Sequence, residues 1–370
     1  MTHRTVTPST RSPAGKCALI MAGGTGGHIF PGLAIAHALR SCGWRVHWLG
    51  GAGSRSHPSM ESLLIPPQGF AFDAIHFGGV RGRGWWMTAL LPLRLMVAWL
   101  QSLLVLRRVR PDVLVGLGGY ITAPAGSMGA LLGIPLVLHE QNAVAGLANR
   151  LQARLASRVF TAFPCVIKGA RWVGNPLRIA FLTVPEPQDR FMGRTGPLRV
   201  LVIGGSQGAQ AFNEVVPRAL ALIPQHRRPM VTHQSGALQI EAVQRHYADA
   251  GVDAQLLPFI DNMAQAMADA DLVVCRAGAS TVTEIAAVGA AALFVPYPYA
   301  VDDHQTQNAR FLVDQGAAWL LPQFQFGPEK LAEILMNTER TTLMNKAIEA
   351  KCLQQTHATE AIVAACEDIL

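Results

Sequence analysis

Residues 21–28 read Met-Ala-Gly-Gly-Thr-Gly-Gly-His, and they join a short apolar run, 17–20, to a helical pattern that carries Pro31 near its first turn. Glycine lets main-chain N–H groups approach a ligand closely, and a helix N-terminus favours negative charge. We therefore predict a strand, a phosphate-binding turn and a helix, with His28 at the rim of the turn. The alternative is a plain tight turn with an exposed histidine, which would not need four glycines in five residues.

The glycine spacing of this turn fits neither standard nucleotide fingerprint. A dinucleotide G-x-G-x-x-G that starts at Gly24 would need glycine at Ile29. A Walker loop that starts at Gly27 reaches Gly32 but lacks the Lys-Ser/Thr pair that follows it. The turn is therefore expected to hold phosphate, but not in the manner of NAD or ATP.

Composition narrows the class of protein. With 370 residues, half of them hydrophobic and 15% charged, the chain predicts two domains with large cores. A formal net charge of +7 indicates an anionic partner, and sparse aromatic residues (7%) make nucleic acid the least favoured one. Six scattered cysteines without a C-x-x-C pair predict buried thiols in a reducing compartment. The N-terminus has no apolar region typical of a secretory signal.

Short apolar runs alternate with helical stretches along almost the whole chain, which predicts an α/β fold of two doubly wound parallel sheets. Prolines crowd at 173–197, which we interpret as the junction of the two halves. We expect a disordered tail at 1–15, a first domain at 16–177, a second at 178–350, and a last helix, about 351–370, that crosses back. The expected strands are 17–22, 45–50, 112–117, 135–139, 158–162, 198–203, 229–233, 254–258, 271–275, 291–295 and 318–321.

The second half repeats the design of the first, because the strand 198–203 leads through the Gly-rich turn 204–209 into a helix. Two such domains would face each other across a cleft lined by the carboxyl ends of their strands. Ser206 could donate its hydroxyl group to an anion there. The alternative is an ordinary turn with Ser206 as the helix N-cap.

Three further polar stretches follow predicted strands, at 138–142, 276–284 and 302–309. The first is expected to contact substrate as a group. In the second, Thr281-x-x-Glu284 reads as a capping box, which alone explains Glu284, although a carboxylate could also accept ribose hydroxyls. The third reads as a set of sugar-hydroxyl contacts, with helix N-capping as its alternative. No acidic cluster has a readable metal-binding spacing.

Residues 78–110 do not follow the strand–helix pattern. A basic and aromatic segment leads into an apolar stretch, 86–106, that is long enough to span a bilayer but is interrupted by proline, arginine and glutamine. We favour a helix that is mostly core, preceded by an exposed patch suited to a membrane interface; a buried helix with basic ends and a true span are the alternatives. The patch comprises Arg81, Arg83, Trp85, Trp86, Leu90 and Arg94.

Taken together, the motifs are similar to those of the MurG family of peptidoglycan N-acetylglucosaminyl transferases, in glycosyltransferase family 28 with the GT-B fold. They run in family order over nearly the whole chain after residue 16. They are GGTGGHIFPG at 23–32, GLGGY at 116–120, HEQNAVAGLAN at 139–149, VGNPLR at 173–178, GGSQGA at 204–209, PFIDNM at 258–263, and the stretches 276–286 and 302–309.

The resemblance implies inverting transfer of GlcNAc from UDP-GlcNAc to the C4 hydroxyl of the MurNAc sugar of lipid I, which gives lipid II. Nothing in the sequence requires a cofactor or a metal, so we expect neither. His28 is the expected general base. The implied donor contacts are Thr25, Gly26, Gly27, Asn142, Arg178, Ser206, Gln207, Ile260 (through its backbone), Ala279, Thr281, Glu284 (to ribose), His304 and Gln305. The implied acceptor and diphosphate site comprises Gly23, Gly24, Thr25, Gly26, Gly27, His28, Tyr120 and Asn142.

The resemblance also implies a peripheral protein on the cytoplasmic side of the inner membrane. Its expected partners are UDP-GlcNAc, undecaprenyl-linked lipid I, the anionic membrane surface and other cell-wall synthesis or division proteins, but not nucleic acid. Another UDP-sugar transferase of the GT-B fold, a UDP-GlcNAc epimerase and a non-catalytic nucleotide-sugar-binding scaffold are the alternatives. His304 stands where some family members have glutamine.

Overall fold

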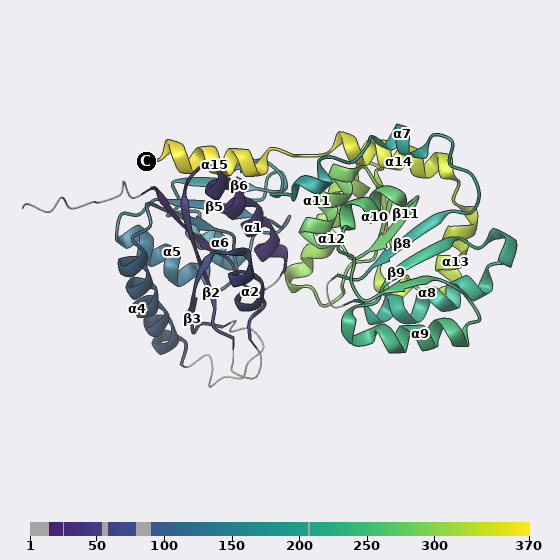
Figure 1. The fold of residues 1–370 in the computed structure, drawn as a ribbon, viewed down its shortest axis with the longest axis horizontal. Helices are drawn as coiled ribbons and strands as arrows, with labels where there is room; N and C mark the ends of the chain where they lie inside the picture. Colours follow the sequence, from purple (N-terminus) through teal and green to yellow (C-terminus); the bar gives the residue numbers. More distant parts are fainter. Residues whose placement is uncertain (1–14, 25, 54–57, 79–89, 206–207) are drawn as a thin grey trace, which may run out of the picture.

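Two parallel β-sheets, one in each half of the chain, organise the protein (Figure 1). The computed structural model describes residues 15–24, 26–53, 58–78, 90–205 and 208–370. The first sheet has seven strands in the order β3-β2-β1-β4-β5-β6-β7, and the second has six in the order β10-β9-β8-β11-β12-β13. The two strand orders correspond when β8 is matched with β1, except that the first sheet has one more strand at its end, β7. Every strand pair is parallel. The predicted α/β fold with two doubly wound sheets is confirmed.

The strand β1 (Cys17–Met21) shows why apolar runs predict this architecture. All five of its residues are buried. Because side chains alternate between the faces of a sheet, Ala18 and Ile20 enter one core and Leu19 and Met21 enter the other. Strand β8 (Arg199–Ile203) divides its buried residues between two cores in the same way. A continuous apolar run therefore marks a strand that is covered by helices on both faces.

The first half is built from alternating strands and helices, apart from its edge strands. Its strands are β1, β2 (Arg45–Gly51), β3 (Ala71–Ile75), β4 (Val113–Gly116), β5 (Leu136–Glu140), β6 (Arg158–Thr161) and β7 (Arg171–Trp172). Its helices are α1 (Gly26–Ser41), α2 (Met60–Leu64), α4 (Leu91–Val109), α5 (Thr122–Leu131) and α6 (Leu147–Gln152).

The second half repeats this alternation. Its strands are β8, β9 (Met230–Gln234), β10 (Gln255–Leu257), β11 (Leu272–Cys275), β12 (Ala292–Phe294) and β13 (Ala318–Leu320). Its helices are α8 (Gln210–Leu222), α9 (Ile240–Asp249), α10 (Met263–Asp269), α11 (Ala279–Val288), α12 (His304–Val313), α13 (Pro328–Asn337) and α14 (Arg340–Cys352). The short helix α7 (Pro187–Phe191) lies on the segment between the halves.

The last helix, α15 (Ala358–Asp368), lies along the first half of the molecule (Figure 1). Ala358, Ile362 and Cys366 are fully buried in the same core as β1 and α1. The preceding helix α14 instead adds Leu343 and Ala347 to a core of the second half. The chain therefore contributes to both halves at its C-terminal end, and the exact domain boundaries stay a prediction.

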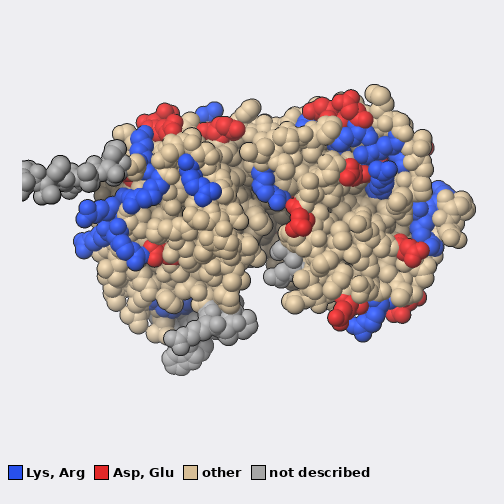
Figure 2. Space-filling model, viewed as in Figure 1, with Lys and Arg blue, Asp and Glu red and all other residues tan. Residues whose placement is uncertain are grey.

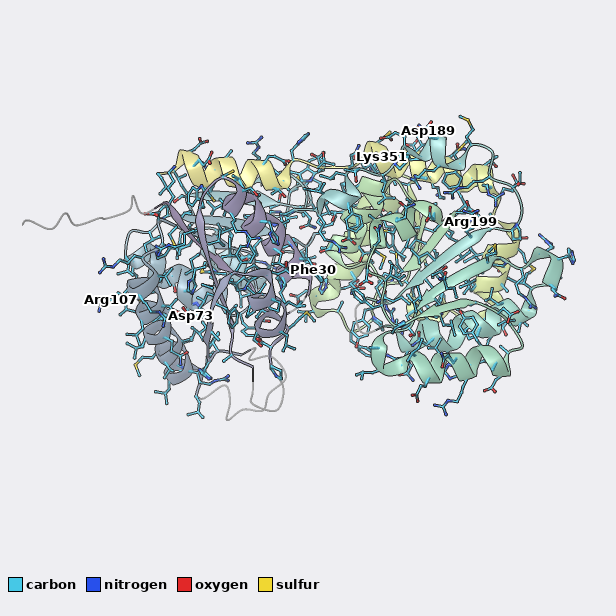
Figure 3. All side chains as sticks on the ribbon, viewed as in Figure 1. Phe30, Asp73, Arg107, Asp189, Arg199 and Lys351 are labelled. Atoms are coloured by element: carbon cyan, nitrogen blue, oxygen red, sulfur yellow. The ribbon has the colours of Figure 1, made fainter. Side chains whose placement is uncertain are left out.

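Two edge strands and one helix start differ from the predictions. Strands β3 and β7 were not expected, because β3 is only partly buried and both residues of β7 are exposed, so neither has an apolar run. Helix α1 begins at Gly26, so Pro31 lies inside the helix rather than near its first turn. Edge strand β3 is held by Asp73, which is labelled in Figure 3. Asp73 pairs with His47 of β2 and Arg108 of α4.

From the sequence we expected helix α4 to be mostly core, and the structure shows that it is not. Only one side of it is buried, through residues such as Ala98, Val105 and Leu106. The opposite side exposes large apolar side chains, among which Leu93, Leu100 and Leu104 are 53%, 55% and 68% exposed. Both sides of the helix therefore carry apolar side chains, and one of these sides faces outward. Among the described residues, no helix is long and apolar enough to cross a membrane.

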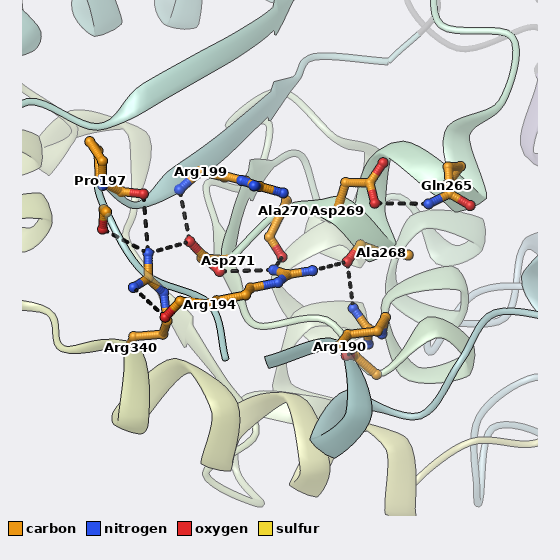
Figure 4. A network of polar contacts seen from close by, with 12 residues as sticks. Arg190, Arg194, Pro197, Arg199, Gln265, Ala268, Asp269, Ala270, Asp271 and Arg340 are labelled. Atoms are coloured by element: carbon orange, nitrogen blue, oxygen red, sulfur yellow. Dashed lines mark hydrogen bonds and ion pairs between the residues drawn. The ribbon is translucent and has the colours of Figure 1, made fainter. Parts of the chain in front are cut away.

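A buried ion cluster fastens the segment between the halves to the second sheet (Figure 4). The Asp271 carboxylate is fully buried and accepts hydrogen bonds from Arg194 at 2.8 Å, Arg340 at 3.2 Å and the Arg199 main-chain N–H at 2.9 Å. Burial raises the pKa of Asp271, but the Arg199 N–H and the two guanidinium groups outweigh it and hold the pKa below its usual value. Asp271 thus joins the linker, β8 and α14 at one point.

We predict that Asp271→Asn lowers the free energy of unfolding by about 3 kcal/mol, because it removes the buried charge that pairs with the partly buried guanidinium groups of Arg194 and Arg340. A lowered folded-state pKa stabilises the protein above the unfolded pKa of about 4, and this stabilisation is lost as the pH falls through the folded pKa. Denaturant unfolding should therefore show a large difference from wild type at neutral pH that shrinks below about pH 4.

The matched control is Asp269→Asn, since Asp269 is exposed and accepts a hydrogen bond from Gln265 one helical turn away (Figure 4). It should change stability by less than about 0.5 kcal/mol. Equal effects of the two substitutions would contradict the role of the cluster.

Candidate functional site

The Gly-rich turn after β1 lies against a second Gly-rich turn, after β4. Gly24, Gly118 and Gly119 have φ values of +93°, +89° and +86°, a backbone region that favours glycine. A Cβ on Gly119 would lie 2.9 Å from the carbonyl oxygen of Gly23. The two turns therefore touch backbone to backbone, at the carboxyl end of the first sheet, where ligands bind in such folds.

His28 lies in the first turn of α1, and its imidazole packs against Gly118, where an added Cβ would lie 3.3 Å from Nε2. A ring N–H of His28 donates to the Gly23 carbonyl. Burial lowers the pKa of His28 to about 4; the Gly23 hydrogen bond opposes this shift, and the charge of His304 adds to it. His28 is therefore neutral at neutral pH, so one ring nitrogen keeps a lone pair that can accept a proton.

The polar stretch after β5 is organised by a buried carboxylate. Glu140 is 2% exposed and accepts hydrogen bonds from the main-chain N–H groups of Asn142 and Gly146, at 2.9 and 3.0 Å, and from Asn149 Nδ2 at 2.8 Å. Tyr120 follows the second turn and lies beside Gly24, with its ring edge-on to Phe77. The structure thus brings Tyr120 and Asn142 to the same end of the sheet as His28.

The two halves meet at Asn142. Asn308 on α12 is fully buried; its Oδ1 accepts from the Ala143 main-chain N–H at 2.7 Å, and its Nδ2 donates to Asn142 Oδ1 at 3.3 Å and to the Ala277 carbonyl at 3.1 Å. Figure 2 shows the two lobes joined in the upper part of the view and separated by a hollow in the lower part. The sequence placed Asn308 in a polar stretch without giving it a role.

The Gly-rich turn of the second half is supported by strand β9. Gln234 Nε2 donates to the Gly205 carbonyl at 3.2 Å, and a Cβ on Gly208, where φ is +74°, would lie 1.8 Å from the Ser235 carbonyl oxygen. Helix α8 begins at Gln210 with Ala209 as its N-cap, so the alternative of Ser206 as N-cap is wrong. Ser206 and Gln207 themselves lie outside the described residues.

The capping-box interpretation of Thr281 and Glu284 is also wrong. Helix α11 begins at Ala279 with Gly278 as N-cap, which places Thr281 in the first turn and Glu284 in the helix interior. Burial raises the pKa of Glu284 to about 7, and Arg178, whose Nη2 lies 3.9 Å from Glu284 Oε1, opposes the shift. The Glu284 side chain has no capping role, a raised pKa and an exposure of 16%, so it is suited to a ligand contact.

Arg178 also contacts the first half, because its guanidinium lies 5.8 Å from the ring centre of Phe30 on α1, which faces the second half (Figure 3). Ile260 is 8% exposed, so mainly its backbone can reach a ligand. The Gln305 side-chain oxygen accepts from the main-chain N–H groups of Ala277 and Tyr297, which leaves its NH₂ group to donate. His304 Nδ1 lies 2.7 Å from the Val301 carbonyl.

Several predicted residues are not placed by the structure. Among the described residues, no group of three or more His, Cys, Asp and Glu could hold a metal ion, and the absence of a metal stays a prediction. Leu90 of the predicted membrane patch directly precedes α4 and is 50% exposed. The predicted residues outside the described ones are Thr25, Ser206, Gln207, Arg81, Arg83, Trp85 and Trp86.

Sequence reasoning missed three residues that shape the site: Glu61, Gln234 and Asn308. Glu61 is 1% exposed and accepts hydrogen bonds from main-chain N–H groups behind the first turn. None of the three belongs to a short motif with a known mechanism. Only Asn308 had a signal, since it lies in a stretch singled out for its polar density.

Comparison with known proteins places the chain among glycosyltransferases. The model of the glycosyltransferase family 28 N-terminal domain matches residues 18–161, and that of the family 28 C-terminal domain matches residues 199–363. A protein of Albidiferax ferrireducens is 68% identical, over 95% of this chain and 91% of its own length. A protein of Ralstonia nicotianae is 56% identical, over 94% and 95%. Both are named UDP-N-acetylglucosamine–N-acetylmuramyl-(pentapeptide) pyrophosphoryl-undecaprenol N-acetylglucosamine transferase.

Solved structures agree with this placement. The crystal structure of MurG from Acinetobacter baumannii is 38% identical, with a TM-score of 0.83, over 95% of this chain and 99% of that one. The spinosyn forosaminyltransferase SpnP is only 13% identical, with a TM-score of 0.65 over 96% and 99%. The second likeness shows the fold alone.

We predict that Gly208→Ala weakens binding of UDP-GlcNAc, the donor that the sequence resemblance implies, by more than about tenfold. The reason is that the new methyl group would push the Gly-rich turn after β8 away from the Ser235 carbonyl. Isothermal titration calorimetry measures this directly. Gly251→Ala is the matched control, since Gly251 also has a positive φ, +63°, but a Cβ there would meet nothing within 4 Å. Unchanged affinity in Gly208→Ala would show that the turn does not hold the donor.

Proposed function

The chain belongs to glycosyltransferase family 28, and from this membership we infer that it transfers GlcNAc from UDP-GlcNAc to the C4 hydroxyl of the MurNAc sugar of lipid I. The products are lipid II and UDP, with inversion at the anomeric carbon. The observation that carries this function is the pair of Gly-rich turns at the facing ends of two sheets, joined by the Asn142–Asn308 contact. This arrangement offers one anion site to each substrate.

The donor side of the proposed mechanism belongs to the second half. The Glu284 carboxylate is proposed to accept the ribose hydroxyls, and Gln305 to donate to the sugar. The amide groups of the turn 204–208 and the N-terminus of α8 would stabilise the negative charge that develops on departing UDP. Arg178 lies beside Glu284 and is half-exposed, so it can turn toward the diphosphate.

The acceptor side belongs to the first half, with His28 as the proposed general base. Neutral imidazole accepts the proton of the C4 hydroxyl while the hydroxyl oxygen attacks the anomeric carbon. The bond from that carbon to the diphosphate oxygen breaks in the same in-line displacement. A low pKa makes His28 a weak base in the free enzyme, but the approach of a diphosphate would favour its protonated form and raise the pKa.

The apolar face of α4 gives this enzyme a proposed membrane-facing surface. Leu93, Leu100 and Leu104 lie on one side of the helix, and basic residues Arg107 and Arg108 lie in its last turn. Figure 2 shows Lys and Arg side chains gathered at the same edge of the molecule, where Figure 3 labels Arg107. Apolar side chains beside cations are suited to the interface of an anionic leaflet. We propose a peripheral position on the cytoplasmic face of the inner membrane, where lipid I is reached.

The function is tested by measuring UDP release from UDP-GlcNAc with a short-chain lipid I analogue. Release that depends on the analogue fixes donor, acceptor and reaction class together. Donor binding without release would retain the donor half of the proposal and exclude lipid I, and an epimerase or another UDP-sugar transferase would then explain the fold.

We predict that His28→Gln lowers kcat by at least about 100-fold, because the general base is removed, while the Kd of UDP-GlcNAc changes by less than about twofold. His226→Gln is the control, since His226 is exposed and lies in a short 3₁₀ turn between α8 and β9. Turnover that survives in His28→Gln would show that another group accepts the proton.

We also predict that replacing Leu93, Leu100 and Leu104 together by glutamine reduces binding to phosphatidylglycerol-containing vesicles by about tenfold or more, because less apolar area can enter the interface. Co-sedimentation measures the binding, and turnover of a water-soluble acceptor should be unchanged. The matched control replaces Leu222, Met230 and Leu238, which are also exposed, in the second half. Equal losses in both triple variants would exclude α4 as the membrane surface.

A further inference from the structure

The peptide group between Gly23 and Gly24 lies between a buried carboxylate and the proposed base. On one side, the Gly24 N–H donates to Glu61 Oε2 at 3.4 Å. On the other side, the Gly23 carbonyl accepts from a ring N–H of His28. In a planar trans peptide the N–H and C=O groups point in opposite directions, so one peptide can make both contacts without strain.

Glu61 is fixed firmly in this position. It is 1% exposed on α2, and its Oε1 accepts from the Gly51 N–H at 2.9 Å. A Cβ on Gly23 would lie 2.3 Å from Oε1, so the carboxylate touches the turn itself. Within the described part of the chain, no Lys, Arg or His forms an ion pair with Glu61. Its charge is therefore stabilised by main-chain N–H groups of the site.

We propose that Glu61 is a positioning residue for His28, acting through the Gly23–Gly24 peptide. This inference rests on the proposed role of His28 as general base. A carboxylate that accepts from a peptide N–H polarises the peptide and makes its carbonyl a better acceptor, since hydrogen bonds in a chain strengthen one another. The carbonyl then holds the imidazole in one tautomer, as a carboxylate does directly in other catalytic sites.

The arrangement has two consequences for the site. The ring nitrogen opposite the Gly23 hydrogen bond stays unprotonated and can face the acceptor hydroxyl. The Gly24 N–H is already occupied by Glu61, whereas Gly26 and Gly27 lie at the N-terminus of α1, where main-chain amides can hold the lipid diphosphate. Glu61 thus separates the role of the turn in orienting the base from its role in binding phosphate.

The first experiment uses the unmodified protein labelled with ¹⁵N-histidine, with the His28 signals assigned by their loss in His28→Gln. We expect one protonated and one unprotonated ring nitrogen, with widely separated ¹⁵N shifts, at pH 7.5. Two averaged shifts would show that no single tautomer is held and would overturn the proposal. Because this measurement needs no substitution at Glu61, averaged shifts would overturn the proposal even if variants at that position do not fold.

The second experiment compares Glu61→Gln with the exposed control Glu329→Gln on α13. Glutamine keeps the shape of the side chain but removes its charge. Its NH₂ group would also face one of the two main-chain N–H groups, of Gly24 or Gly51, and two donors cannot form a hydrogen bond. We expect the two ¹⁵N shifts of His28 to converge and kcat to fall between about tenfold and 100-fold, while the Kd of UDP-GlcNAc changes by less than about twofold. Unchanged shifts and an unchanged kcat would overturn the proposal.

A double-mutant cycle separates this inference from the proposed function. If Glu61 acts through His28, Glu61→Gln should have almost no further effect on kcat in the His28→Gln background. An equal loss in both backgrounds would assign Glu61 a purely structural role. If His28→Gln alone retained turnover, the base assignment would fail, and the ¹⁵N shifts would still report whether Glu61 holds the tautomer of His28.

Discussion

The candidate site depends on close contact between main chain and main chain at glycine positions. Gly119 approaches the carbonyl of Gly23, and Gly208 approaches the carbonyl of Ser235, so closely that no Cβ fits at either place. Each Gly-rich turn is therefore shaped by the backbone beside it and not by a ligand. Donor groups that are already oriented need no rearrangement when charge develops in the reaction, which is the main source of their effect. Glycine has the most flexible backbone of all residues, but at these positions it allows the close backbone contacts that make the turns rigid.

Most of the fold could be predicted from the sequence because both sheets are covered on both faces. A strand such as β1, buried along its whole length, must be apolar at every position, and that pattern is visible without a structure. The edge strands β3 and β7 escape this rule, since an edge strand is partly exposed and its residues are mixed. The outward face of α4 could not be predicted for a related reason. Periodicity separates two sides of a helix, but here both sides are largely apolar and only the tertiary contacts decide which is buried.

The site was predicted in its parts but not in its connections. Glycine turns and polar strand ends carry local signals, whereas the residues that join them come from distant positions: Glu61 is 37 residues from Gly24, and Asn308 is 165 residues from Ala143. A local motif can also mislead. Thr281 and Glu284 have the spacing of a capping box, but the helix begins two residues before Thr281, because Gly278 provides the N-cap. Helix starts are set by backbone geometry that a two-residue motif does not contain.

Helix α12 links the donor site to the contact between the two halves. Its first residues, His304 and Gln305, are the proposed sugar contacts, and Asn308 lies one turn further along the same helix. Asn308 binds Asn142 and Ala143 of the first half, and Asn142 in turn donates its main-chain N–H to Glu140. The helix that carries the proposed sugar contacts is therefore also the helix that is hydrogen-bonded to the polar stretch bordering the acceptor site. One stiff element thus fixes the position of the donor contacts relative to Asn142, because residues one turn apart on a helix keep a constant spacing.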